Sequence, residues 1–251
     1  MKFDALGTSW WITAALTDQQ FSQLIEYVQL YEARLSRFID SSEVSHLNQV
    51  KKIENPSADL RELIHISLEY FKTTDGLFNI TELPARLDPS LRVSTDLSKD
   101  IQKTIEGIQI SDDIQLDFGG LGKGFLLDTL LAKISSQTSG EIIVNGGGDL
   151  RFINVAEPFP IKHPFENTVV TRISAVDGAI ATSVAHGREY AGQNHISVQS
   201  SIAQASVVAD MAVDADVLAT AALSSPDPIS FLNERNCRYV VVDTDGIVTT
   251  S

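Results

Sequence analysis

The sequence contains a single cysteine, Cys237, so it can form neither an internal disulfide nor a zinc site built from several thiolates. Basic residues are also few. The chain has 19 lysines and arginines against 33 aspartates and glutamates, a formal net charge of -14, and no basic cluster denser than Lys51 and Lys52. Such a chain repels a phosphate backbone, which argues against nucleic acid as a partner.

Long hydrophobic runs are missing as well. No stretch approaches the roughly 18 consecutive apolar residues of a transmembrane helix. Near the N-terminus, Lys2 is followed by FDALGTSWWITAAL, which carries Asp4 early and is typical of a strand rather than of a signal peptide. We therefore expect no transmembrane segment and a cytoplasmic protein, or an extracytoplasmic one if a leader was removed before residue 1.

The remaining pattern predicts strands and helices in mixed order. Strands are expected at 3–15, 169–176 and 179–183, helices at 17–38, 42–50, 60–71 and 121–134, and loops at 84–99 and 155–166. Hairpins are expected from 105–110 with 114–118, from 141–153 around a glycine turn, and at the C-terminal end around Asp245 and Gly246, with a strand-to-helix segment at 205–223. Segments 114–118, 121–134 and 141–146 also suggest a βαβ crossover. The order favours an α+β fold of mixed or antiparallel sheets flanked by helices, in two closely packed halves of one domain, 1–251.

The segment LDFGGLGKGF, residues 116–125, combines Asp117, several glycines and Lys123 at the expected start of a helix. Exposed backbone amides and a helix N-terminus suit an anionic phosphate, although an ordinary glycine-rich start of a helix has the same composition. The segment is not a Walker A loop, because Asp117 stands where that motif needs glycine and Gly124 where it needs a hydroxyl residue.

A second glycine segment, VNGGGDLR at 144–151, would let a ligand lie directly against the main chain. A tight turn between two strands explains the three glycines equally well. Because the two glycine segments flank one expected helix, we expect them to lie near each other.

The segment ADVLATAA, residues 215–222, places Asp216 and Thr220 on one face of a helix. A carboxylate and a hydroxyl in this arrangement can bind a hard cation such as Mg²⁺. The alternative is an aspartate near a helix N-terminus and a threonine bonded to its own helix. His195 follows a polar run, and a solitary histidine of this kind is more often a surface or core residue than a functional one.

The order of these segments resembles the ApbE family of FAD:protein FMN transferases. The matching segments are ALGTSW at 5–10, EARLSRFIDSSEVSHLN at 32–48, TDGLFNIT at 74–81, LDFGGLGKGFLLD at 116–128, IIVNGGGDLR at 142–151, AIATS at 179–183, NHI at 194–196 and ADVLATAA at 215–222. Each segment alone is a weak signal, but eight in order cover nearly the whole chain.

The resemblance implies an Mg²⁺-dependent transferase that attaches FMN from FAD to a threonine or serine of an acceptor protein and releases AMP. It implies metal ligation by Asp216, Thr220 and the main-chain carbonyl of Gly120, with His195 as the base. The residues that it implies for FAD are Leu6, Phe38, Leu77, Phe78, Asn79, Asp117, Lys123 and Ile196. Phe38 and Phe78 could stack on a ring of FAD or serve as core aromatics, and Lys123 is expected to face the phosphates.

The chain departs from the family pattern after His195. The family usually has HIIDPRTG where this chain has HISVQSS, residues 195–201. Asn79 stands in place of a usual aspartate, and VAH at 184–186 replaces a usual glycine-acid-tyrosine run. Two alternatives to the transferase therefore stay open: an FAD-binding pseudoenzyme, and an Mg²⁺-dependent FAD pyrophosphatase that uses water as the nucleophile.

Overall fold

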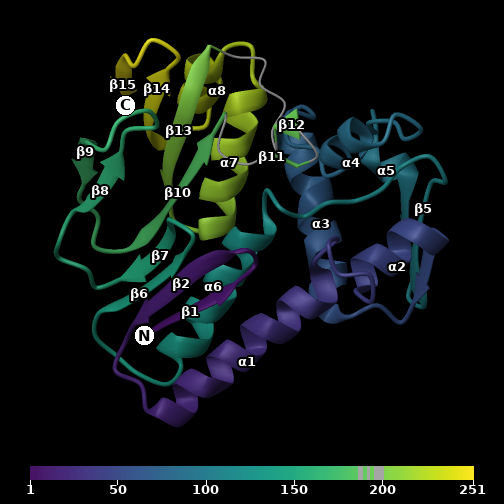
Figure 1. Cartoon of the computed structure of the whole chain (residues 1–251), viewed down its shortest axis with the longest axis horizontal. Helices are drawn as coiled ribbons and strands as arrows, with labels where there is room; N and C mark the ends of the chain where they lie inside the picture. Colours follow the sequence, from purple (N-terminus) through teal and green to yellow (C-terminus); the bar gives the residue numbers. More distant parts are fainter. Residues whose placement is uncertain (186–188, 191–192, 195–200) are drawn as a thin grey trace.

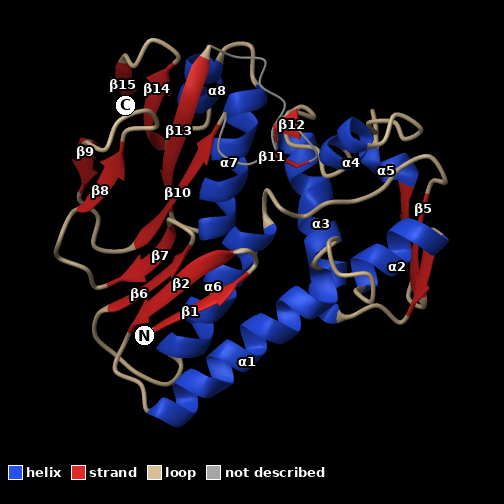
Figure 2. Cartoon of the chain, in the orientation of Figure 1, coloured by secondary structure: helices blue, strands red, loops and turns tan. Residues whose placement is uncertain are grey.

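An eight-stranded sheet forms one side of the molecule, and a smaller lobe of helices with a three-stranded sheet forms the other (Figures 1 and 2). The computed structural model describes residues 1–185, 189–190, 193–194 and 201–251. The helices α6 (Gly122–Ser135) and α7 (Ala212–Ser224) lie between the large sheet and the smaller lobe (Figure 1).

All neighbouring strands of the large sheet run antiparallel, in the order β1-β2-β6-β7-β10-β13-β14-β15. The strands are β1 (Lys2–Ala5), β2 (Thr8–Thr13), β6 (Ile142–Gly146), β7 (Asp149–Ile153), β10 (Gly178–Val184), β13 (Ile202–Ala209), β14 (Arg238–Asp243) and β15 (Val248–Thr250). A two-stranded ribbon of β8 (Phe159–Lys162) and β9 (Val169–Ile173) completes this part, and β11 (Glu189–Tyr190) with β12 (Gln193–Asn194) forms a separate short pair.

The smaller lobe follows the long helix α1 (Asp18–Leu35), which runs beneath both parts of the molecule (Figure 1). It contains α2 (Glu43–Val50), α3 (Ala58–Thr73), α4 (Glu82–Leu87), α5 (Leu97–Asp100) and the sheet β3-β5-β4, formed by Lys52–Glu54, Gly107–Ile110 and Ile101–Lys103. A last helix, α8 (Pro228–Glu234), precedes β14. Hydroxyl side chains begin the first three helices, because Thr17, Ser42 and Ser57 each accept an N–H from the first turn.

Side-chain alternation gives the large sheet two different faces. Leu150 and Phe152 of β7 join Ile180 of β10 in a core cluster that the β8–β9 ribbon covers. Asp149 and Arg151 alternate with these two residues along β7. Their side chains therefore point to the opposite face of the sheet, where α6 and α7 pack. This alternation places polar side chains of the sheet against the two helices.

The structure confirms the predicted α+β architecture of antiparallel sheets flanked by helices, with several local corrections. Residues 3–15 form the β1–β2 hairpin rather than one strand, and α1 ends at Leu35 rather than 38. The expected loops contain the last residues of α4, the start of α5 and all of β8. The strand-to-helix segment and the C-terminal hairpin are confirmed as β13 with α7 and β14 with β15.

The predicted hairpin of 105–110 with 114–118, and with it the βαβ crossover, is wrong. β5 instead pairs with β3 and β4, and residues 111–121 form no strand. The side chain of Asn48 replaces a neighbouring strand, since its amide donates to the Leu116 carbonyl (2.9 Å) and accepts the Leu116 N–H (2.7 Å). A strand-like sequence thus meets its backbone hydrogen bonds without entering a sheet.

Candidate functional site

Lys123 lies at the centre of a buried charge cluster where α6, α7 and β7 meet. Its ammonium contacts the Asp149 carboxylate at 2.6 Å and both carboxylate oxygens of Asp216 at 3.3 Å. Asp216 is only 3% exposed, and its Oδ2 also accepts the N–H of Gly124 (3.1 Å). Asp149 Oδ1 accepts the N–H of Thr182 in β10 (3.0 Å), so the cluster joins both helices to the sheet.

The cluster holds two carboxylates against one cation. Burial raises the pKa of Asp216 to about 7, because the opposing effect of Lys123 does not offset the loss of water and Asp149 adds to the rise. Burial alone would lower the pKa of Lys123, but the two carboxylates together raise it above the ordinary value. Lys123 therefore keeps its positive charge at this site. The negative charge of Asp216 is offset by Lys123 only in part.

A close approach of the two helices builds the cluster. A Cβ at Gly124 would lie 2.6 Å from the carbonyl oxygen of Ala212, so α6 and α7 can touch here only because position 124 is glycine. Asp128, one turn further along α6, accepts the N–H groups of Ala212 (3.0 Å) and Val213 (2.9 Å). The carboxylate of Asp128 thereby caps α7, whose own first residues supply no side-chain cap.

A pocket opens beside this cluster, between the smaller lobe and α7. Its lining residues are Leu77, Phe78, Asn79, Ile80, Glu82, Leu83, Asp117, Gly120, Thr220 and Ser224. Six of these residues were predicted from the sequence as FAD or metal contacts: Leu77, Phe78, Asn79, Asp117, Gly120 and Thr220. The structure therefore brings together segments 77–79, 117–120 and α7, which are far apart in the chain.

Gly120 and Thr220 are direct neighbours in this pocket. A Cβ at Gly120 would lie 3.0 Å from the Phe78 ring and 3.6 Å from Thr220 Oγ1. The Thr220 hydroxyl also contacts the Ser183 hydroxyl of β10 at 3.1 Å. Asp216 lies one helical turn before Thr220 on α7, but its buried carboxylate is bonded to Lys123 and to the Gly124 N–H and is not among the groups that line the pocket.

These oxygen groups fit Mg²⁺ better than they fit a softer metal. Among the residues that the structure describes, no three His, Cys, Asp or Glu side chains gather in a way that could hold a metal. A dedicated protein cage is thus missing from this part of the chain.

Of the other predicted residues, Leu6 and Phe38 lie apart from the pocket. Leu6 forms the β1–β2 turn with Gly7, and this turn lies near the glycine segment between β6 and β7, where the Gly147 N–H donates to the Ser9 carbonyl (3.1 Å). Phe38 follows the end of α1, is 57% exposed and carries the Arg37 guanidinium over its ring. His195 and Ile196 lie outside the described residues.

Two further aspartates, the buried Asp149 and the partly buried Asp128, belong to the site but were not among the predicted ligands. The signal for Asp149 was present, since it follows three glycines directly at the start of a strand. Asp128 ends the LDFGGLGKGFLLD segment and lies on the same face of α6 as Gly124, four residues earlier. Only the position of α7 shows that this carboxylate caps a helix.

The model of the ApbE family matches residues 6–240, nearly the full length of the chain. The chain belongs to the ApbE family. No curated protein matches it at the sequence level.

Solved structures of ApbE proteins share the fold over the whole chain. An ApbE protein from Thermotoga maritima has a TM-score of 0.83 at 19% identity, covering 100% of this chain and 96% of that one. The flavin transferase ApbE from Vibrio cholerae has a TM-score of 0.80 at 17% identity, covering 100% and 95%. The apo flavinyl transferase ApbE from Pseudomonas stutzeri reaches 0.79 at 15%, covering 100% and 94%. The ApbE fold is thus retained although most residues differ. None of the described helices is long and apolar enough to cross a membrane.

Proposed function

We propose that this protein is an Mg²⁺-dependent FAD:protein FMN transferase. The observation that carries the proposal is the meeting of Gly120, Thr220 and the 77–79 segment in one pocket, beside the buried Lys123–Asp149–Asp216 cluster. Membership of the ApbE family and the similarity in fold to the flavin transferase ApbE from Vibrio cholerae and the flavinyl transferase ApbE from Pseudomonas stutzeri support it.

In this proposal, Mg²⁺ is held by Asp216, Thr220 and the Gly120 carbonyl. Bound there, the ion would neutralise charge that develops on the pyrophosphate during transfer. Leu77, Phe78, Asn79 and Asp117, which line the same pocket, would contact FAD. Lys123 contributes a fixed positive charge behind the metal ligands, because it is already paired with Asp149 and reaches Asp216 only at 3.3 Å.

The proposed reaction is the transfer of FMN to a hydroxyl group. A threonine or serine oxygen of the acceptor protein forms a bond to the FMN phosphorus, the bridging P–O bond of the pyrophosphate breaks, and AMP leaves. The hydroxyl proton passes to a base, for which His195 is the candidate. Leu6, Phe38 and Ile196 stay proposed FAD contacts on the resemblance alone.

The test is an assay that follows both products. We would incubate the protein with FAD, MgCl₂ and a candidate acceptor that carries a threonine or serine flavinylation motif, and measure AMP together with the mass of the acceptor. The transferase yields AMP and an acceptor heavier by one FMN phosphoester. AMP without labelled acceptor would identify a pyrophosphatase, and bound FAD without AMP would identify a binding protein.

Asp216→Ala tests the metal site within this proposal. We expect the substitution to abolish Mg²⁺-dependent AMP release while the protein stays folded, because a hard-cation ligand is lost. Thr220→Val should weaken the Mg²⁺ dependence in the same direction with little change in volume. Asp245→Ala, in the exposed β14–β15 turn, is the matched control, and a wild-type Mg²⁺ titration in the Asp216 variant would contradict the assigned site.

A further inference from the structure

A polar network backs the pocket wall on the side away from α7, and it begins at Asn79. The Asn79 side chain accepts the backbone N–H (3.1 Å) and the hydroxyl (2.8 Å) of Thr81. Its amide nitrogen donates to the Ser94 carbonyl (2.8 Å). Three hydrogen bonds thus fix the direction of a side chain that lines the pocket.

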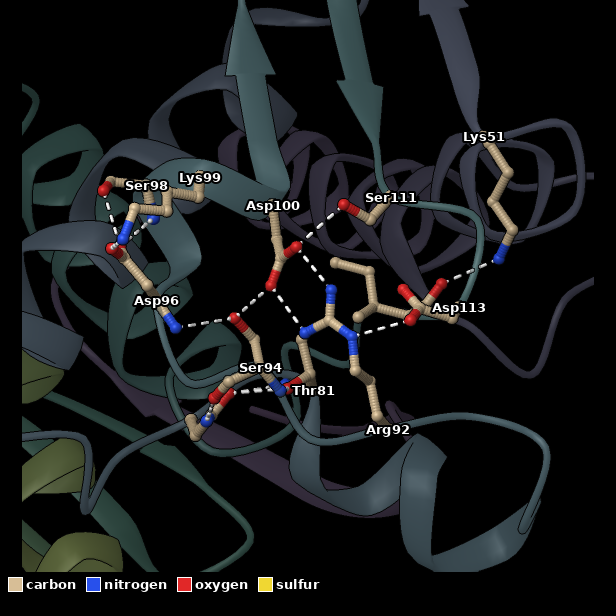
Figure 3. Close-up of polar contacts among 12 residues, drawn as sticks. Lys51, Thr81, Arg92, Ser94, Asp96, Ser98, Lys99, Asp100, Ser111 and Asp113 are labelled. Carbon is tan, nitrogen blue, oxygen red and sulfur yellow. Dashed lines mark hydrogen bonds and ion pairs between the residues drawn. The ribbon is translucent and has the colours of Figure 1, made fainter.

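The network continues from Asn79 to Asp100 through two hydroxyl residues (Figure 3). The Thr81 hydroxyl accepts the Ser94 N–H (2.8 Å), and the Ser94 hydroxyl donates to Asp100 Oδ2 (2.6 Å). Thr81 and Ser94 are both fully enclosed, so their polar groups depend on these partners rather than on water.

Asp100 is the anchor of the network. Its carboxylate accepts two N–H groups of the Arg92 guanidinium, at 2.6 and 2.8 Å, and the Ser111 hydroxyl at 2.8 Å (Figure 3). These bonds, the ones from Arg92 above all, hold the pKa of Asp100 well below its usual range. The carboxylate is therefore ionised at every working pH, and the bidentate pair fixes its orientation.

The same contacts explain why position 79 carries an amide in this chain. The Ser94 carbonyl needs a donor at 2.8 Å, which asparagine supplies and an ionised aspartate cannot. An aspartate would place negative charge against a carbonyl oxygen in a site with little water. Asn79 and the Ser94 segment therefore form a matched pair.

We propose that Asp100 is a positioning residue, which acts through Ser94 and Thr81 to fix the Asn79 side chain in the pocket and so sets the affinity for FAD. The proposal rests on the proposed function, in which this pocket binds FAD. A purely structural role for Asp100 would change the stability of the smaller lobe without changing the affinity of folded protein for FAD.

A double-mutant cycle separates the two roles. FAD dissociation constants would be measured by flavin fluorescence for wild type, Asp100→Asn, Asn79→Ala and the double variant, with MgCl₂ and at a temperature where all four are folded. We expect Asp100→Asn to weaken FAD binding by roughly tenfold, the effect of one well-placed hydrogen bond. In the Asn79→Ala background the same substitution should have no further effect, because the residue through which it acts is gone.

Asp113→Asn is the matched control. Asp113 binds the same Arg92 guanidinium at its Nε (2.7 Å), but it lies on a branch that does not lead to Asn79. This variant should bind FAD with an affinity within about twofold of wild type. Equal effects of the Asp100 and Asp113 variants, or additive effects of the Asp100 and Asn79 variants, would overturn the proposal.

A second variant, Thr81→Val, and a second measurement, amide exchange by NMR, provide two further tests of the network. Thr81→Val cuts the network between Asn79 and Ser94 without touching a charge, and should weaken FAD binding as Asp100→Asn does. The side-chain amide protons of Asn79 should exchange slowly in wild type and faster in Asp100→Asn, as seen by NMR. Wild-type protein that binds no FAD would refute the proposed function, whereas unchanged amide exchange in Asp100→Asn would refute the network.

Discussion

Leu6 adopts a backbone conformation that leucine rarely occupies. Its φ is +51° and that of Gly7 is +66°, the pair of positive values required by a two-residue turn that matches the twist of the β1–β2 hairpin. Glycine or asparagine normally fills such positions, because a Cβ costs roughly 1 kcal/mol there. The family resemblance implies that Leu6 contacts FAD. A functional role of this kind would explain why a strained leucine is kept at position 6.

Leu6→Gly should therefore separate stability from binding. We expect the free energy of unfolding to stay within about 1 kcal/mol of wild type, because relieved strain offsets the lost packing of a half-buried leucine. FAD affinity should fall if the side chain contacts FAD. Urea unfolding and a flavin titration measure the two effects, and unchanged affinity would remove Leu6 from the proposed site.

Lys123 has a structural role that its sequence motif does not reveal. Lys123→Met would leave the Asp149 and Asp216 carboxylates buried side by side without a cation. We expect the free energy of unfolding to fall by about 3–5 kcal/mol, as when one partner of a buried ion pair is removed. Lys133→Met, on the exposed side of the same helix, is the control and should cost less than about 1 kcal/mol. Equal losses in chemical denaturation would contradict the buried cluster.

At the scale of elements, α7 carries the proposed metal ligands but does not hold itself in place. Its N-terminus depends on Asp128 of α6, which also pairs with Arg151 of β7 at 2.8 Å. A further contact comes from α3, where the Tyr70 hydroxyl donates to the Asp214 carboxylate. The position of Asp216 and Thr220 is thus decided by neighbouring elements.

Asp128→Asn should loosen this arrangement. An amide has only one acceptor oxygen, so it cannot accept both the Ala212 and the Val213 N–H and also neutralise Arg151. We expect a loss of about 2–4 kcal/mol in unfolding free energy and faster hydrogen exchange at the first amides of α7. Ser42→Ala, which removes the cap of α2, should cost about 1 kcal/mol and leave exchange in α7 unchanged.

For the whole molecule, two electrostatic effects oppose each other as the pH falls. The net charge of -14 at pH 7 creates self-repulsion, which weakens as carboxylates take up protons. The folded state, however, lowers the pKa of several carboxyls, including Asp88, Asp96, Asp100 and Asp227, through hydrogen bonds to their charged forms. Their contribution to stability is complete above the ordinary aspartate pKa and is lost as the pH falls through the lowered values.

The stability of the protein should therefore be greatest at about pH 5–6 and fall steeply below pH 4. Asp100→Asn should be less stable than wild type at pH 7, and the difference should shrink as the pH falls below about 4, because the unfolded chain then takes up a proton on Asp100 that the folded carboxylate, with its lowered pKa, still resists. Thermal unfolding from pH 2.5 to 8 measures both. A difference that stays constant down to pH 2.5 would show that the charge of Asp100 does not contribute.

The sequence by itself determined the kinds of elements and most of the pocket. Helical spacing of apolar residues located α1, α3 and α6, and the glycine motifs located the 116–125 and 144–151 segments, because these signals depend on neighbours within one or two turns. The ordered motifs also indicated the ApbE family. Six of the predicted ligand residues line the pocket.

Only the tertiary structure decided which polar groups meet. IQLDF has the composition of a strand, yet the Asn48 side chain takes its backbone hydrogen bonds, a contact across 68 residues that no local pattern encodes. In the same way, Lys123 bonds to Asp149 and Asp216, 26 and 93 residues away. The local sequence shows only that such side chains are polar. The packing of α6 on α7 buries them and selects their partners, because burial makes an unpaired charge too costly to remain.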